Sequence, residues 1–135
     1  MPYFDCYLAP VPKANQAAYE ELARISEQVL LECGAIRVVE CWLDEGGPEA
    51  ATYHGAEVRL ESPQYSSFSQ AAGARAGETV VMSFVEWPDK PTRDAGMEKL
   101  TSDPRMQFDG QPPVFDGRRL IAAGFKPMLS AAGED

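Results

Sequence analysis

The chain has 135 residues, of which 44% are hydrophobic and 24% are charged. This length and balance predict one soluble globular domain with its own hydrophobic core. The formal net charge of −9 disfavours nucleic acids and anionic membranes as partners, since both attract basic proteins. No apolar run approaches the ~20 residues of a membrane span. We also see no signal-peptide pattern, so we expect a cytoplasmic protein.

The first third of the chain predicts a strand, a long helix and a second strand. Residues 3–9 form the first strand, and the prolines that follow are expected to end it. Residues 13–33 carry apolar side chains at three- and four-residue spacing, which predicts a helix that Gly34 ends in the left-handed conformation. Residues 35–43 alternate apolar side chains on two faces and predict the second strand.

Residues 44–77 form the least regular part of the sequence. They are rich in Ala, Gly, Ser and Glu, and we interpret them as a long loop insertion. Within this insertion, residues 56–60 have the composition of a short extra strand, and residues 66–77 that of a mobile loop. A connection of this length in a small domain is usually either disordered or functional.

The second half of the chain is organised around residues 78–88, the run richest in β-branched and aromatic side chains. This composition is typical of a strand in the middle of a sheet, buried on both faces. Asp89 is a suitable cap for a helix over residues 90–102. Residues 118–125 predict the last strand, and residues 128–135 a flexible C-terminal tail.

The predicted order of strands and helices is β-α-β, a long loop, then β-α-β. Two such units within residues 1–127 indicate an α+β domain with a ferredoxin-like βαββαβ antiparallel sheet and both helices on one face. The strands carry large apolar side chains on both faces, which would leave one face of the sheet as an exposed apolar surface. We therefore expect a homodimer in which a second copy covers that face.

The candidate functional residues lie on the predicted strands. Carboxylates inside a sheet must be paired, solvated or shifted in pKa, and one of them could act as a general base. We take Glu40 and Asp5 as candidate catalytic groups, with Trp42 as an apolar wall beside Glu40. Ser83 and Glu86 are candidate ligand-binding residues. The structural alternative, which we favour, is that Glu40 or Glu86 pairs with an arginine of the sheet or of a second subunit; the candidates are Arg37, Arg118 and Arg119.

Two further features have a structural and a functional interpretation. The run Asp103-Pro104-Arg105-Met106 predicts a helix stop, and Arg105 could alternatively bind a carboxylate of a ligand or of the other subunit. His54 is the only histidine and has no suitably spaced metal ligand beside it, so we interpret it as a solvated loop residue. The three cysteines form no CxxC pair and are expected to be reduced. We therefore predict no metal and no cofactor.

Several blocks of the sequence resemble a known family. Glu78-Thr-Val-Val-Met-Ser-Phe, Asp103-Pro-Arg-Met and Phe115-Asp-Gly-Arg-Arg-Leu-Ile are similar to the bacterial YbaA-like proteins, the domain of unknown function 1428. The resemblance extends over nearly the whole chain and implies the dimeric α/β-barrel fold. That superfamily includes haem-degrading and quinone-forming monooxygenases and many members without a known activity. The family supplies no catalytic residues that could be transferred to this sequence.

Three hypotheses for the function follow. The chain could bind a small molecule in a barrel cavity, or act on it without a cofactor, through an acid–base carboxylate. It could instead be a non-catalytic homodimeric module with a structural or regulatory role. A haem monooxygenase activity is a third hypothesis, which rests on analogy of fold alone.

Overall fold

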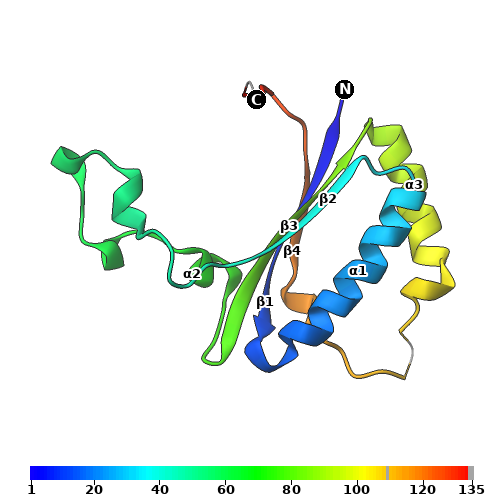
Figure 1. The fold of residues 1–135 in the computed structure, drawn as a ribbon, viewed down its shortest axis with the longest axis horizontal. Coiled ribbons are helices and arrows are strands. Elements are labelled where there is room, and N and C mark those ends of the chain that lie inside the picture. The colour runs from blue at the N-terminus through cyan, green and yellow to red at the C-terminus, as the bar shows by residue number, and fades with distance from the viewer. Residues whose placement is uncertain (109, 134–135) are drawn as a thin grey trace.

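The computed structural model describes residues 1–108 and 110–133. Within these residues the fold is α+β, as predicted, with one four-stranded antiparallel sheet and three α-helices (Figure 1). The strands are β1 (Tyr3–Pro12), β2 (Arg37–Trp42), β3 (Glu78–Trp87) and β4 (Ile121–Phe125). The helices are α1 (Gln16–Glu32), α2 (Phe68–Ala72) and α3 (Lys90–Ser102).

The strands lie in the order β2-β3-β1-β4, and every neighbouring pair is antiparallel. The sheet is open, with β2 and β4 at its edges. Helices α1 and α3 lie side by side over one face, which we call the helix face (Figure 1). β3 is central, as its composition predicts.

The first strand is longer than the sequence predicts. β1 continues through Pro10 to Pro12, whereas we expected the prolines to end it. The reason is the limited length of β4, which pairs with β1 only from Phe4 to Leu8. Beyond Leu8, β1 is paired on one side alone, by β3, so that the prolines, which lack an N–H, lie where one edge of the strand is free.

The helix boundaries follow the capping signals in the sequence. Gly34 follows α1 with φ of 111°, a conformation that favours glycine. The Asp89 carboxylate accepts a hydrogen bond of 2.7 Å from the backbone N–H of Thr92 and caps α3. None of the helices within residues 1–108 and 110–133 has the length and apolar character needed to cross a membrane.

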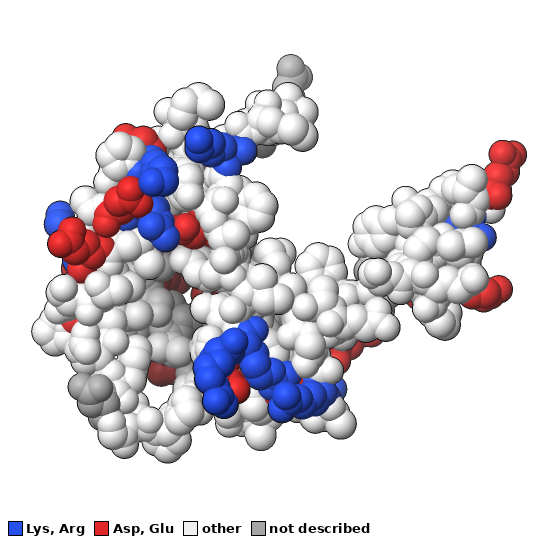
Figure 2. Space-filling view, turned by 180° about the vertical axis from the view of Figure 1, so that it is seen from behind, with Lys and Arg blue, Asp and Glu red and all other residues white. Residues whose placement is uncertain are grey.

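The segment between β2 and β3 differs most from its prediction. Residues Ala56–Val58 form a 3₁₀ turn and not a strand, because this part of the chain projects away from the sheet and has no strand to pair with (Figure 1 and Figure 2). Phe68–Ala72, predicted to be part of a mobile loop, form helix α2. The cap is a reciprocal pair of hydrogen bonds between Ser67 and Gln70, a signal that composition alone does not reveal.

The beginning of the last strand also differs. We expected residues 118–125 to be extended, but Gly117–Arg119 form a 3₁₀ turn and β4 starts only at Ile121. The Asp116 carboxylate stabilises the turn by accepting a hydrogen bond from the N–H of Arg118. Residues 126–133 are in no helix or strand, and residues 134–135 of the predicted tail, which spans residues 128–135, lie outside the described residues.

The opposite face of the sheet, which we call the open face, is mainly apolar, and several of its large side chains are exposed within this chain. Met82 of β3 is 41% exposed, and Ile121 and Phe125 of β4 are 50% and 55% exposed. Only the end of this face near Pro10 and Val80 is buried. The prediction that the central strand is buried on both faces therefore fails for Met82 in the single chain.

Candidate functional site

Three polar side chains form a row across the middle of the helix face. Glu40 of β2 lies opposite Ser83 of β3, and Ser83 lies opposite Tyr7 of β1. Because they are direct cross-strand neighbours, their side chains point to the same face of the sheet. We call these three residues the polar row. Apolar clusters centred on Val81 and Val85 lie on either side of it.

A cavity of about 320 Å³ lies over the polar row, between the sheet and the covering helices. We call it the inner cavity. Its volume is at the lower end of the range for small-molecule sites in proteins, roughly 300–1,000 Å³. Its walls are mainly apolar and come from α1, α3 and the crossover that precedes β4; they include Leu22, Leu30, Met97, Leu100, Met106 and Phe108.

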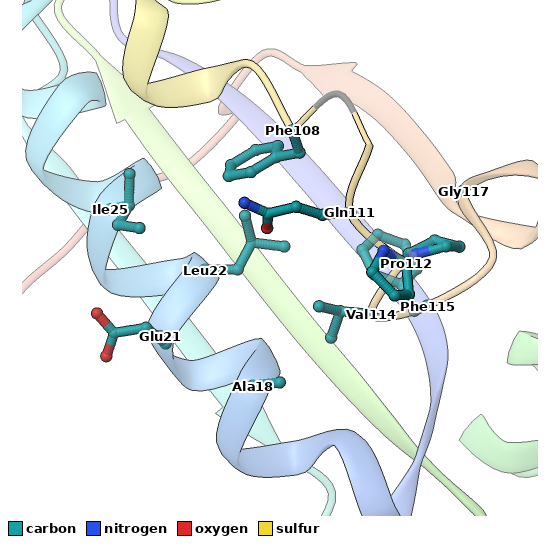
Figure 3. A pocket seen from close by; sticks show the side chains of 11 residues that line it. Ala18, Glu21, Leu22, Ile25, Phe108, Gln111, Pro112, Val114, Phe115 and Gly117 are labelled. Atoms are coloured by element: carbon teal, nitrogen blue, oxygen red, sulfur yellow. The ribbon is translucent and has the colours of Figure 1, made fainter.

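A second hollow, of about 550 Å³, adjoins the inner cavity and is open at the surface between α1 and the crossover (Figure 3). We call it the outer groove. Leu22, Phe108 and Phe115 line both spaces, so the outer groove and the inner cavity share a wall. In Figure 3, Leu22 projects from α1 toward the crossover, whereas Glu21 directs its carboxylate away from it.

Glu40 is held by neutral hydrogen-bond donors. The Tyr19 hydroxyl, on α1, donates a hydrogen bond of 2.9 Å to Glu40 Oε1, and the Ser83 hydroxyl also donates to this carboxylate. Burial in the apolar surroundings raises the pKa of Glu40 above its ordinary value, although these two hydrogen bonds oppose the change. The negative charge of Glu27 raises this pKa further. β2 is an edge strand, and Glu40 is exposed to solvent along this edge.

Tyr7 is the second reactive group of the polar row. Burial, followed by the nearby charge of Asp5, raises the pKa of Tyr7 to about 12, so its hydroxyl remains a hydrogen-bond donor at neutral pH. Within residues 1–108 and 110–133, this hydroxyl has no hydrogen-bond partner, although the ring lines the inner cavity. It is therefore available to a bound molecule.

The pKa of Glu40 predicts a specific pH dependence of stability. Because the folded state binds this proton more tightly than the unfolded state, the free energy of unfolding should fall as pH rises from 4.5 through the raised pKa. Glu40→Gln removes this titration and keeps an acceptor for Tyr19. As pH rises through this window, the free energy of unfolding, measured by urea denaturation, should fall more for the wild type than for the variant. A constant difference would contradict the assignment.

Asp5 lies on the helix face but has a structural environment. It is 3% exposed, and its Oδ2 accepts hydrogen bonds of 3.0 Å from both Trp87 Nε1 and Arg93 Nε. Asp5 does not line the inner cavity. We therefore revise its expected role from acid–base catalysis to a buried ion pair that joins β1, β3 and α3.

Trp42 lies on the helix face with Glu40, as expected, whereas Glu86 lies on the opposite face. The Trp42 ring packs edge-on against Tyr19 at 5.3 Å between centroids, and its Nε1 donates to Glu20, so it supports Tyr19 and does not line the inner cavity. Glu86 lies opposite Phe4 and Arg37 on the open face. It therefore points away from Glu40 and, unlike Ser83, does not line the inner cavity.

The arginines do not neutralise Glu40 within the described chain. Arg119 pairs with Glu78 at 2.7 Å, and Arg118 pairs with Asp116 at 3.1 Å. Arg37 lies over the Phe84 ring, at 5.5 Å from its centroid. Among the described residues, none of these three arginines therefore pairs with Glu40, and pairing with an arginine of a second subunit stays a prediction.

Arg105 has the structural role that its sequence context favours. It follows α3, and its guanidinium pairs with Asp103 and with Glu32 of α1, both at 2.8 Å. The Asp103 carboxylate also accepts a hydrogen bond from the backbone N–H of Arg105, as expected for a helix stop. Arg105 does not line the inner cavity, whereas its neighbour Met106 does.

Three parts of the site were not predicted from the sequence: Tyr7, Tyr19 and the crossover. Tyr19 lies on the apolar stripe of the first helix, where a tyrosine is usually a core residue. Tyr7 is two residues from Asp5 and thus on the same face, which is the one signal that could have identified it. His54 stacks on Tyr65 in the projecting segment, and no three metal-ligating side chains gather anywhere in the described ranges.

Comparisons with known proteins give a consistent match. The model of a family described as a protein of unknown function (DUF1428) matches residues 2–117. The uncharacterized protein YbaA of Escherichia coli strain K12 is 34% identical over 129 residues, which cover 96% of this chain and 98% of YbaA. The uncharacterized proteins YbaA of E. coli O157:H7 and of Shigella flexneri match equally. These matches confirm the resemblance inferred from the sequence blocks.

Proposed function

Because the chain belongs to the DUF1428 family, whose description assigns no function, we propose one from the geometry of the site: the protein binds a small, largely apolar molecule in the inner cavity. Glu40 is the acid–base group of this site. The observation that carries the proposal is the polar row at the floor of an apolar cavity, with the Tyr7 hydroxyl unpaired among the described residues. Apolar walls with a few convergent polar groups are typical of ligand sites.

The polar row also supports proton transfer. Glu40 has a raised pKa and can accept a proton, while the Tyr7 hydroxyl can donate a hydrogen bond on the other side of Ser83. A carboxylate with a raised pKa, such as that of Glu40, is a candidate general base, since its pKa lies closer to neutrality than that of a solvated carboxylate. The site therefore supports either plain binding or a cofactor-free reaction of the bound molecule.

The proposal predicts that filling the inner cavity abolishes binding. Ala23 of α1 lines the cavity, and Ala23→Leu places additional methyl groups inside it. In a thermal-shift screen of single-ring alcohols, phenols, amines and acids, at least one compound should stabilise the wild type and not this variant. At about 100 times its Kd, a ligand adds ~2.7 kcal/mol to the folded state.

The matched control is Ala17→Leu, an exposed position on the same helix. Because Ala17 does not line the cavity, this variant should retain the wild-type response. If no compound stabilises the wild type, or if both variants respond equally, the inner cavity is not a binding site.

We also propose that the chain forms a homodimer through its open face, in a ferredoxin-like dimeric α/β barrel. The strand order β2-β3-β1-β4, with two helices on one face, supports the ferredoxin-like assignment. The exposed apolar side chains of the open face, among them Met82, Ile121 and Phe125, support a second copy as its cover. Because the inner cavity lies on the helix face, this proposal is independent of ligand binding.

The dimer proposal predicts that a charge at the centre of the open face separates the subunits. Met82 lies between Leu8 and Cys41 in the sheet register, so Met82→Glu would bury a carboxylate in the interface. Light scattering should give twice 14.8 kDa for the wild type and 14.8 kDa for this variant. Met128→Glu, in the exposed tail, is the control and should remain dimeric. A monomeric wild type would contradict the proposal.

A further inference from the structure

The charges around the inner cavity select among the molecules that it could hold. Glu40 is the only charged side chain among the described residues that line the cavity, and the groups that donate to it, Tyr19 and Ser83, are neutral. No lysine, arginine or histidine is among the described lining residues of the inner cavity or of the outer groove. The carboxylate therefore lacks a cationic partner on its cavity side.

An anionic ligand is disfavoured by this arrangement. Its charge would lie beside the Glu40 carboxylate, and no lysine, arginine or histidine among the described lining residues could stabilise both. Two carboxylates that share a site repel each other, and one of them must then take up a proton. The net charge of −9 adds a general preference for cations over anions near the surface.

A protonated amine would instead be attracted by the Glu40 carboxylate. Its N–H donors can form charge-assisted hydrogen bonds with the carboxylate, which are stronger than those from neutral donors. The aromatic side chains that line the cavity, Tyr7, Tyr19, Phe108 and Phe115, can interact with a cation through their rings. The remaining apolar wall suits the hydrocarbon part of such a molecule.

We propose that the ligand of the inner cavity is a hydrophobic amine, whose ammonium group pairs with Glu40 and whose apolar body extends past Leu22 and Phe108 toward the outer groove. This inference rests on the proposed function, since it assigns a chemical class to the same site. On its solvent side, Glu40 lines a shallow hollow together with the α1 residues Glu20, Arg24 and Glu27. Arg24 forms an ion pair with Glu21 at 3.1 Å.

The test compares three probes with one skeleton: 2-phenylethylamine, 2-phenylethanol and phenylacetate. Calorimetric titration at pH 7.5 should give the amine a Kd at least about tenfold lower than the alcohol, with the acid weakest, because an ion pair replaces a neutral hydrogen bond. In Glu40→Gln, the Kd of the amine should rise to about that of the alcohol, because the ion pair is lost.

The outcomes separate the two proposals. If the alcohol binds as tightly as the amine, or the acid binds most tightly, the assignment to amines is overturned while ligand binding in the cavity stands. If none of the three probes binds the wild type, or if Ala23→Leu does not reduce their binding, both proposals fail. Tyr7→Phe serves as a second variant: loss of its hydroxyl should leave the preference for the amine intact, and a loss of that preference would contradict Glu40 as the partner of the ammonium group.

Discussion

Asp5→Ala should destabilise the protein by about 3–5 kcal/mol, the range for breaking a buried ion pair by removal of one partner. The side chain of Asp5 is 5% exposed and holds both Arg93 of α3 and the indole N–H of Trp87. Its loss leaves the guanidinium without its buried partner and leaves a buried indole donor without an acceptor. For a chain of this length, thermal unfolding should occur roughly 10–15 °C lower.

Asp94→Ala is the matched control for this variant. Asp94 pairs with the same guanidinium, through Arg93 Nη1 at 3.1 Å, but its side chain is 49% exposed. Exposed ion pairs contribute about 0–1 kcal/mol, so this variant should unfold close to the wild-type temperature. Similar losses in the two variants would show that burial does not determine the contribution of Asp5.

Gly96→Val should produce the second large loss of stability, about 3 kcal/mol. A Cβ atom at Gly96 would lie 2.6 Å from Cζ3 of Trp87 and 2.8 Å from the carbonyl oxygen of Cys33. Since Trp87 is fully buried and Cys33 contributes backbone, neither can move without a shift of α3 away from the sheet. Overpacking of this kind typically costs about 1–3 kcal/mol, and valine adds two further methyl groups. Urea denaturation measures the loss.

Ala95→Val, one residue earlier, distinguishes packing from helix propensity. Ala95 is exposed on the same helix, so the substitution costs only the lower helix propensity of valine, about 0.5–0.7 kcal/mol. If Gly96→Val had the same free energy of unfolding as the wild type, this result would contradict the close packing of α3 on Trp87.

The sequence predicted the elements whose signals are local. Gly34, Asp89 and Asp103 mark helix ends by their own backbone chemistry, and the structure confirms each of them. The apolar composition of β3 predicted its central place, because a middle strand is covered by neighbours on both edges. The errors arose where the pairing of strands decides the structure. β1 continues through Pro10 and Pro12 because β4 is too short to pair with that part of it. Ala56–Val58 form no strand because they have no strand to pair with.

The candidate site was predicted only in part, for a similar reason. Alternation along a strand indicates which residues share a face, and it placed Glu40 and Trp42 on one face correctly. It does not fix the register between strands, which brings Tyr7 and Ser83 to Glu40 and sends Glu86 to the open face. Arg93, which forms the ion pair with Asp5, lies 88 residues away from it in the chain, and no local sequence pattern indicates that contact.

The central claim, that the inner cavity binds a small molecule, can be tested most directly through the methionines. Met97 and Met106 line the inner cavity, whereas Met1, Met82 and Met128 lie outside it. In a protein labelled with ¹³C at the methionine methyl groups, titration with 2-phenylethylamine should shift the resonances of Met97 and Met106 and leave those of Met1 and Met128 unchanged. Saturable shifts at these two methyl groups, absent in Ala23→Leu, are the predicted result. Shifts confined to Met82, or no shift at Met97 and Met106, would contradict the claim.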